Sequence, residues 1–218
     1  MKNHNCTIWG NIPEPENFEE IVQLALSIPK NSGRVRMWRG QGNIDWPIHS
    51  GAFRRLNNSS HADPDDMDIR MYEKTLLQHA SHKGYHYING RALSDLELLA
   101  RLQHHGAATR LIDFSKNVLV ALFFCVTNEI KKPGLLVGIH TDYLGGYEHQ
   151  LDERSYDEIM DQVEKYDHSI TWDPTGVTGR IDAQNSQFLY SKTSSDKRGS
   201  LLMPMDPDSV MTIAISSK

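Results

Sequence analysis

Hydrophobic residues follow two different periods along the chain, and each period predicts a different kind of element. Apolar residues at intervals of three or four follow Asn17 and Glu20, a pair typical of a helix N-terminus, so a helix is expected over residues 18–28. The same interval, restricted to one face, predicts a second helix over about 67–82. Both helices are therefore expected to bury one side on a core.

The middle of the chain predicts two further helices. Ser94 and Glu97 form a capping box before a helix that runs up to Gly106, a residue typical of the position just after a helix end. Ser115 is expected to cap the next helix, over about 116–128. This helix is apolar on nearly every side, which predicts that it is buried at the centre of the fold.

Strands are predicted where apolar residues alternate with polar ones or run together between turns. A short strand from Val35 ends on Arg39, and Gly40 and Gly42 make its exit tight. Further strands are expected over residues 134–141, 180–191 and 209–216. Helices and strands do not alternate regularly, so the fold class is predicted to be α+β, a single domain with a mixed or antiparallel sheet packed on the buried central helix.

Two polar stretches interrupt this pattern. Residues 57–66 are predicted to be a polar surface loop, because they combine Asn, Ser, Asp and Pro and have no reason to be ordered by burial. Residues 142–179 are mixed and polar, with one helix expected over 156–166, and are interpreted as a surface insertion. The chain is accordingly divided into an N-terminal helical segment, residues 1–32, and a main domain, residues 33–218.

Composition and charge narrow the classes of function and location. The formal net charge of −5 gives no overall attraction to nucleic acid or to an anionic membrane, although a local basic patch is compatible with it. Cys6 and Cys125 form neither a disulfide framework nor a zinc signature and are interpreted as free thiols in a reducing compartment. No apolar span reaches the roughly 18 residues that a bilayer requires, and the N-terminal segment lacks a signal-peptide pattern. We therefore expect a cytoplasmic protein without a membrane partner.

Arg39 is the first candidate for chemistry. The neighbouring glycines are expected to leave its guanidinium and the nearby backbone amides accessible, which suits recognition of a phosphate or a carboxylate. The alternative is a structural arginine tied to an acidic loop. Gln41 would add an amide donor and acceptor beside it.

The segment from Gln103 to Ser115 holds the other candidates. His104 and His105 end a helix, where a histidine serves as an acid-base group, a metal ligand or a polar cap. Neither HExxH nor a Cys/His grouping occurs, so no metal site is predicted. Asp113 lies between two apolar residues, so its carboxylate needs a partner, and a structural ion pair is the favoured role. The partners available to it are Thr109, Arg110 and Arg39.

Several well-known signatures are absent from the sequence. Ser115 lies in neither a GxSxG nor an SxxK motif, so serine hydrolase chemistry is unsupported. The phosphate-binding patterns GxGxxG and GxxxxGK[ST] do not occur either, which removes the sequence basis for a Rossmann or P-loop site.

Two motifs together resemble the FRG-domain family, which takes its name from a Phe/Tyr-Arg-Gly motif. The first comprises Trp38-Arg39-Gly40-Gln41 followed by Trp46, Pro47 and Phe53-Arg54-Arg55. The second, of the form Gln-His-x-Gly-x-x-Thr-Arg-Leu-Leu-Asp-Trp-Thr, is matched by Gln103 to Ser115, with Phe114-Ser115 in place of Trp-Thr, and an apolar helix follows as in the family. A weaker third motif is similar to Arg180, Gln184, Asn185, Ser186, Gln187 and Phe188, with Ser186 where the family has glycine. The resemblance covers roughly residues 33 to 216.

A more remote similarity connects the chain to ADP-ribosyltransferases of the Arg-Ser-Glu type. Arg39-Gly40, the segment 109–115 and the segment 180–188 follow the order of their three motifs. The similarity implies that Arg39 holds a phosphate of NAD, that 109–115 builds the nicotinamide pocket and that an acid polarises the ribose. Gln184 or Gln187 replaces the expected Glu, so such catalysis would be weak or would use another acid such as Asp182.

These resemblances imply a protein that binds or processes NAD or a related nucleotide, by ADP-ribosyl transfer or NAD hydrolysis, in phage defence or a toxin-type conflict. NAD would be the substrate, no resident cofactor is assigned, and a sensor or effector whose activity needs a protein partner is compatible with the same resemblance. The candidate catalytic residues are Arg39, His104, Asp113 and Gln184, and the candidate binding residues are Arg39, Gly40, Gln41, Thr109, Arg110 and Ser115.

The alternative is a nucleic-acid or protein recognition module without catalysis. In that case a strip of basic residues would bind the partner together with two tryptophans, and the affinity for a nucleic acid would fall steeply with salt concentration. The strip comprises Arg34, Arg36, Arg39, Arg54 and Arg55, with Trp38 and Trp46.

Overall fold

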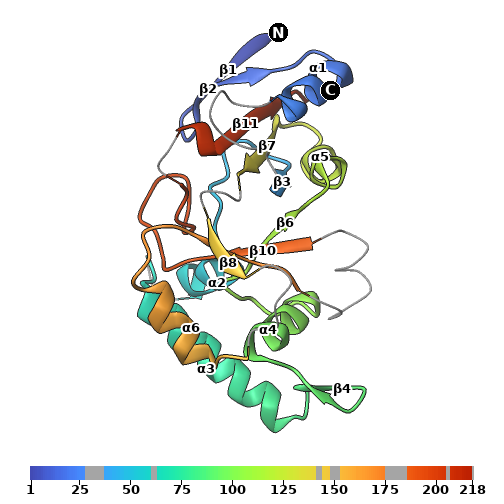
Figure 1. Ribbon diagram of the computed structural model, residues 1–218. Helices are drawn as coiled ribbons and strands as arrows, with labels where there is room; N and C mark the ends of the chain where they lie inside the picture. Colours follow the sequence, from blue (N-terminus) through green and yellow to red (C-terminus); the bar gives the residue numbers. More distant parts are fainter. Residues whose placement is uncertain are drawn as a thin grey trace.

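The fold is known from a computed structural model that describes residues 1–27, 37–59, 63–140, 144–147, 153–174, 186–204 and 207–217. Figure 1 shows an elongated molecule with a sheet across its middle and both chain ends at one extremity. Helices α3 (Asp66–His82), α4 (Asp95–His104) and α6 (Tyr156–Val163) gather at the opposite extremity (Figure 1). The predicted α+β class is confirmed.

The central sheet has seven strands within the described part of the chain, in the order β11-β7-β3-β6-β10-β9-β8. All neighbours are antiparallel except β8 and β9, so the sheet is mixed. In that order the strands are Val210–Ile215, Gly134–Ile139, Met37–Gln41, Ile112–Ser115, Ser186–Tyr190, Ile170–Trp172 and Gly145–Tyr147. None of the helices in the described ranges is long and apolar enough to cross a membrane.

The junction between β3 and β6 divides the sheet into two halves. Strand β3 pairs with β7 over five residues, from Met37 opposite Ile139 to Gln41 opposite Leu135. With β6 it is paired at Trp38 and Ser115. Beyond this contact the two strands diverge, and the remainder of β3 faces an opening instead of a neighbouring backbone.

Helix α5 (Val118–Thr127) packs against the β3 side of the sheet, as its apolar sequence predicted. Ala121 and Cys125 are buried there, and α1 (Phe18–Leu26) covers the same core cluster. The expectation that α5 is buried on nearly every side is wrong, because Leu119, Phe123 and Val126 are at least half exposed. The helix lies on the outside of the sheet, so only one of its faces meets a neighbour.

The helix caps largely follow the sequence. Asn17 accepts from the backbone N–H of Glu20 at the start of α1, and the Ser94–Glu97 capping box at α4 is complete. Gly106 follows the α4 C-cap with φ of +93°, the left-handed conformation expected of it. Ser115 is the exception, because it is a strand residue and Asn117 caps α5 through an acceptor bond from the N–H of Leu119.

Three regions differ from the sequence-based expectation. The segment before α1 contains a hairpin, β1 (Lys2–Cys6) and β2 (Gly10–Glu14), which short polar strands gave no reason to predict. The stretch predicted as a loop from residue 57 begins with the last turn of α2 (Gly51–Ser59). A small hairpin, β4 (Tyr87–Ile88) and β5 (Arg91–Ala92), turns through Asn89 and Gly90, both with positive φ.

The stretch 142–179 is not a peripheral insertion. Within its described part, α6 contributes Ile159, Met160 and Val163, each 1% exposed, to the largest core cluster, and β9 adds Ile170 and Trp172 to the same cluster. The strand pairs with β10 inside the sheet. The predicted helix is therefore present, but its apolar face closes the core under α3 and α4. Polar residues on its other face gave the stretch a surface-like composition.

Candidate functional site

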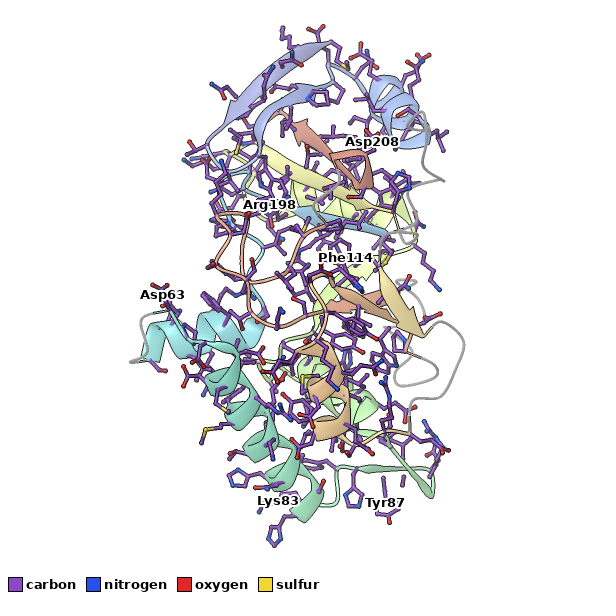
Figure 2. The ribbon with its side chains drawn as sticks, turned by 60° about the vertical axis from the view of Figure 1, so that its left-hand side comes forward. Asp63, Lys83, Tyr87, Phe114, Arg198 and Asp208 are labelled. Atoms are coloured by element: carbon purple, nitrogen blue, oxygen red, sulfur yellow. The ribbon has the colours of Figure 1, made fainter. Side chains whose placement is uncertain are left out.

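A cleft of about 670 Å³ opens where β3 and β6 diverge. One wall comes from β3 and the loop after it, and another from α5, which contributes Val120, Ala121 and Phe124. The end of α4 and strand β6 complete the site, and Phe188 of β10 closes its base. Phe114 of β6 lies near the middle of the long axis of the molecule, so the cleft occupies the centre of the fold (Figure 2).

Arg39 lies in the middle of β3 and not at its end as expected, since the strand continues to Gln41. Its Nη1 donates to the backbone oxygen of Asp113 at 2.7 Å, so the guanidinium bridges the diverging strands where a backbone bond is missing. Its Nε is buried and has no partner among the described residues. Burial lowers the pKa of Arg39, the charge of Arg54 lowers it further, and Asp113 opposes the shift. Arg39 is thus a poorly solvated cation with hydrogen-bonding capacity left over.

Position 40 requires a glycine for a reason other than the access to the Arg39 guanidinium that the sequence suggested. A Cβ built on Gly40 would lie 1.8 Å from the backbone oxygen of Ala121 and 2.8 Å from the sulfur of Cys125. The glycine therefore lets α5 approach β3 directly. Gly40 still borders the cleft, but its first requirement is the contact between helix and strand.

Gln41 acts on the loop that follows β3. Its Nε2 donates to the backbone oxygen of Trp46 at 2.5 Å and of Asn43 at 3.3 Å, and the side chain is buried. These bonds hold Trp46, which is 43% exposed, at the rim of the cleft. Gln41 lines the cleft as the sequence suggested, with its amide donor already used inside the protein.

Asp113 is oriented by a short chain of hydrogen bonds. The hydroxyl of Thr109 donates to Oε1 of Gln103, and Nε2 of Gln103 donates to Oδ1 of Asp113 at 3.0 Å. Thr109 is fully buried, whereas Asp113 is exposed and lines the cleft. An amide that donates to a carboxylate oxygen fixes the direction of that group. The Asp113 carboxylate is therefore presented to the cleft by the motif itself.

His104 and Ser115 also border the cleft, from opposite sides. His104 lies in the last turn of α4, and its ring meets that of His105 edge-on at 5.1 Å between centroids. Ser115 is buried at the β3–β6 junction, where its Oγ accepts from the backbone N–H of Asn117. His104 is the more accessible of the two candidates.

Arg110 does not line the cleft. Its Nε and backbone N–H both donate to the Glu73 carboxylate, each at 2.6 Å, and Nη2 donates to the Tyr156 hydroxyl at 3.1 Å. Nη1 donates to Asp66 at 3.1 Å. Arg110 is 3% exposed and Glu73 is fully buried, so this ion pair links the segment just before β6 to α3, and the bond to Tyr156 links it to α6. The two adjacent residues of the motif therefore have different roles. Thr109 orients Gln103 beside the cleft, whereas Arg110 forms an ion pair in the core.

Three residues that are not among the predicted catalytic or NAD-binding residues complete the polar end of the cleft. Arg54 is exposed on α2 and lines the cleft, as do Gln103 and His49. The His49 ring stacks on Phe53 with centroids 4.4 Å apart, and its Nδ1 accepts from the backbone N–H of Ser200 at 3.1 Å. Burial and the charge of Arg54 lower the pKa of His49, which favours the neutral ring. Because Nδ1 accepts from Ser200, the proton of that neutral ring lies on Nε2.

No signal in the sequence distinguished His49, since a lone histidine before a helix carries no pattern. Gln103 was visible only as a member of a family motif, and Arg54 as a member of a family motif and of the basic strip. Gln184, a predicted catalytic residue, lies outside the described residues. The other three predicted catalytic residues all line one cleft; they are Arg39, His104 and Asp113. Within the described ranges no group of three His, Cys, Asp or Glu residues is arranged to hold a metal ion.

The sequence model of the FRG domain matches residues 34–133, and this part of the chain belongs to the FRG-domain family. The match contains both motifs and nearly all of the cleft, with Ser186 and Phe188 of β10 contributed from outside it. Comparisons with curated proteins and with solved structures gave no match.

Proposed function

We propose that the cleft binds NAD or a related nucleotide in the cytoplasm. The observation that carries the proposal is the meeting of a guanidinium, Arg39, and an oriented carboxylate, Asp113, in one cleft with aromatic walls. A nucleotide offers a partner for each feature, because it joins anionic phosphates to ribose hydroxyls and planar rings.

Size and lining support a ligand of this class. A volume of about 670 Å³ falls within the roughly 300–1,000 Å³ range of small-molecule sites. Trp46 at the rim and Phe124 of α5 offer faces for a base or a nicotinamide ring, while Phe114 and Phe188 are buried beneath. The polar groups gather around Arg39, so the cleft has an apolar part and a charged part.

The proposed chemistry is ADP-ribosyl transfer or NAD hydrolysis. Both break the bond between nicotinamide and the ribose C1′, and nicotinamide leaves with the bonding electrons while positive charge develops on the ribose. A carboxylate held near the ribose stabilises that charge, and water or an acceptor nucleophile then attacks C1′ and loses its proton. Asp113 is the one carboxylate that lines the cleft within the described part of the chain.

Replacement of Arg39 by glutamine is expected to weaken NAD binding about tenfold or more, because a charge-assisted hydrogen bond to phosphate contributes about 1.5–3 kcal/mol. Isothermal titration calorimetry with NAD measures this change. Arg55→Gln is the matched control, since Arg55 is exposed on α2 and does not line the cleft. Equal affinity for NAD in the wild type and Arg39→Gln, or no binding in either, would remove the proposal.

Replacement of Asp113 by asparagine is expected to preserve NAD binding and to reduce nicotinamide release by about 10²–10³-fold. Asparagine keeps an oxygen that can accept from Gln103, so the local structure persists while the charge is lost. Nicotinamide release and transfer of labelled ADP-ribose are measured together, with kcat and KM determined separately. A variant as active as the wild type would contradict the role of Asp113 and leave the binding proposal in place.

The competing function, recognition of nucleic acid, finds less support in the geometry. Arg39 is engaged inside the cleft with the Asp113 carbonyl, and Arg34 and Arg36 lie outside the described residues. Arg54, Arg55 and Trp46 remain exposed. Binding to DNA or RNA that falls steeply with salt, together with indifference to NAD, would favour this alternative.

The biological setting implied by the family resemblance is phage defence or a toxin-type conflict. An NAD-consuming activity would act there by depleting the NAD of the cell in which it is released. Cellular NAD after expression of the wild type and Asp113→Asn is the corresponding readout.

A further inference from the structure

A second, smaller pocket adjoins the cleft and is lined mainly by polar groups. Its volume is about 260 Å³, and it shares five lining residues with the cleft: Arg39, His49, Arg54, Gln103 and Asp113. Because the same side chains border both spaces, the side pocket is a branch of the cleft. Its remaining lining comes from Ser50 and Gly51 at the start of α2, from residues 106–109, and from Leu111 and Ile112.

Two guanidinium groups converge on this branch from different elements. Arg39 comes from β3 and Arg54 from α2, and they are close enough that the charge of Arg54 disfavours the charge of Arg39. Like charges placed together without a neutralising group are destabilising. The one carboxylate that lines the branch within the described residues is Asp113, whose Oδ1 is occupied by Gln103. With His49 neutral, the lining therefore has an excess of positive charge.

The hydrogen-bond donors that the described residues leave without a partner in the branch indicate a polyatomic anion as the ligand. The buried Nε of Arg39 has no partner among the described residues, and the guanidinium of Arg54 is exposed beside it. His49 uses Nδ1 as an acceptor toward Ser200, which leaves the protonated Nε2 as a donor. Tetrahedral phosphate oxygens match forked arginine donors better than a halide does, and the branch exceeds the roughly 30 Å³ of one water several-fold.

The start of α2 favours an anion in the branch electrostatically, but two of its backbone N–H groups are already used in hydrogen bonds within the protein. The N–H of Ala52 already donates to the backbone oxygen of Thr109 at 2.9 Å, and that of Phe53 donates to the hydroxyl of Ser50 at 3.2 Å. The positive end of the helix dipole still faces the branch. The side chains, and not the helix end, are thus the principal ligands for an anion.

From this arrangement we infer that the side pocket is a phosphate subsite in which Arg54, Arg39 and His49 hold a phosphoryl or pyrophosphoryl group, while the ring-bearing part of the same ligand occupies the cleft. The inference rests on the proposed function and narrows it. The ligand is a phosphorylated nucleoside bound by two separate parts, and the unphosphorylated nucleoside is a poor ligand.

The test measures binding of pyrophosphate, ADP, adenosine and NAD to the full chain by isothermal titration calorimetry. Pyrophosphate is expected to bind alone and to compete with ADP, and ADP is expected to bind at least about tenfold more tightly than adenosine. Arg54→Gln is expected to weaken ADP and pyrophosphate about tenfold and to leave adenosine unchanged. Arg55→Gln, one residue along the same helix and outside both spaces, should match the wild type for every ligand.

Arg54 is exposed, so its replacement should leave the fold intact, and circular dichroism spectra of both variants verify this. Absence of pyrophosphate binding to the wild type, or equal ADP affinity in Arg54→Gln and Arg55→Gln, overturns the phosphate subsite. If NAD binds normally in that case, the proposed function survives without it. If pyrophosphate binds through Arg54 and NAD does not bind, the subsite stands and the NAD proposal fails.

Discussion

Replacement of Glu73 by alanine is expected to destabilise the protein by about 3–5 kcal/mol, because it removes the fully buried counter-ion of Arg110 and leaves the partly exposed Asp66 as its remaining carboxylate partner. The Glu73 carboxylate accepts from the Nε and the backbone N–H of Arg110 and from the Tyr156 hydroxyl, each at 2.6 Å. Neither Arg110 nor Glu73 has appreciable contact with water. Urea unfolding followed by circular dichroism gives the change in the free energy of unfolding.

The neighbouring residue provides the control for this prediction. Lys74 lies on the exposed side of α3 and pairs with Asp157 at 2.8 Å, with both side chains nearly half exposed. Because solvent screens such a pair, Lys74→Gln should cost less than about 1 kcal/mol. A loss below about 1 kcal/mol for Glu73→Ala as well would show that the buried pair is not a structural link.

Replacement of Gly40 by alanine is expected to cost about 3 kcal/mol and to abolish ligand binding. The new methyl group would overlap the backbone oxygen of Ala121, and backbone of a helix cannot move aside as a flexible side chain can. Helix α5 must therefore shift away from β3. Because Val120 and Phe124 of α5 line the cleft, the shift changes the site as well as the stability. Thermal unfolding and NAD titration measure the two effects.

Gly84→Ala, just after the C-cap of α3, is the matched control, because Gly84 lines neither the cleft nor its branch. Gly84 has φ of +77°, and nothing lies within 4 Å of an added Cβ, so the cost is backbone strain of about 1 kcal/mol without a steric clash. Its effect on NAD binding should be small. Equal losses of stability and binding in the two variants would mean that conformation, and not helix packing, explains the glycine at position 40.

The agreement between sequence and structure was best where interactions are local. The capping residues of α1 and α4 and the end of α4 at Gly106 depend on hydrogen bonds within about four residues, which the sequence displays directly. The cap of α5 was misplaced by two residues because Ser115 is drawn into β6 by pairing with Trp38 and Ser186. A partner distant in sequence decided that boundary.

The segment 142–179 shows the same limit at the level of the core. Its composition is polar, yet Tyr156, Ile159, Met160 and Val163 of α6 form one buried face. Whether such a face meets a core or solvent depends on which other elements present an apolar surface to it. Helix α5 is the opposite case, since an apolar sequence left Leu119, Phe123 and Val126 exposed.

The sequence by itself determined the FRG-domain motifs, the α+β class, most helices and the candidates Arg39, His104 and Asp113. Only the tertiary structure decided that these three residues share a cleft, that Gln103 orients Asp113, and that Arg54 and His49 join Arg39 at a polar branch. The tertiary structure also assigned different roles to Thr109 and Arg110, which are neighbours in one motif. Both residues lie in the loop before β6, and the strands and helices packed around that loop decide which of the two side chains faces the cleft.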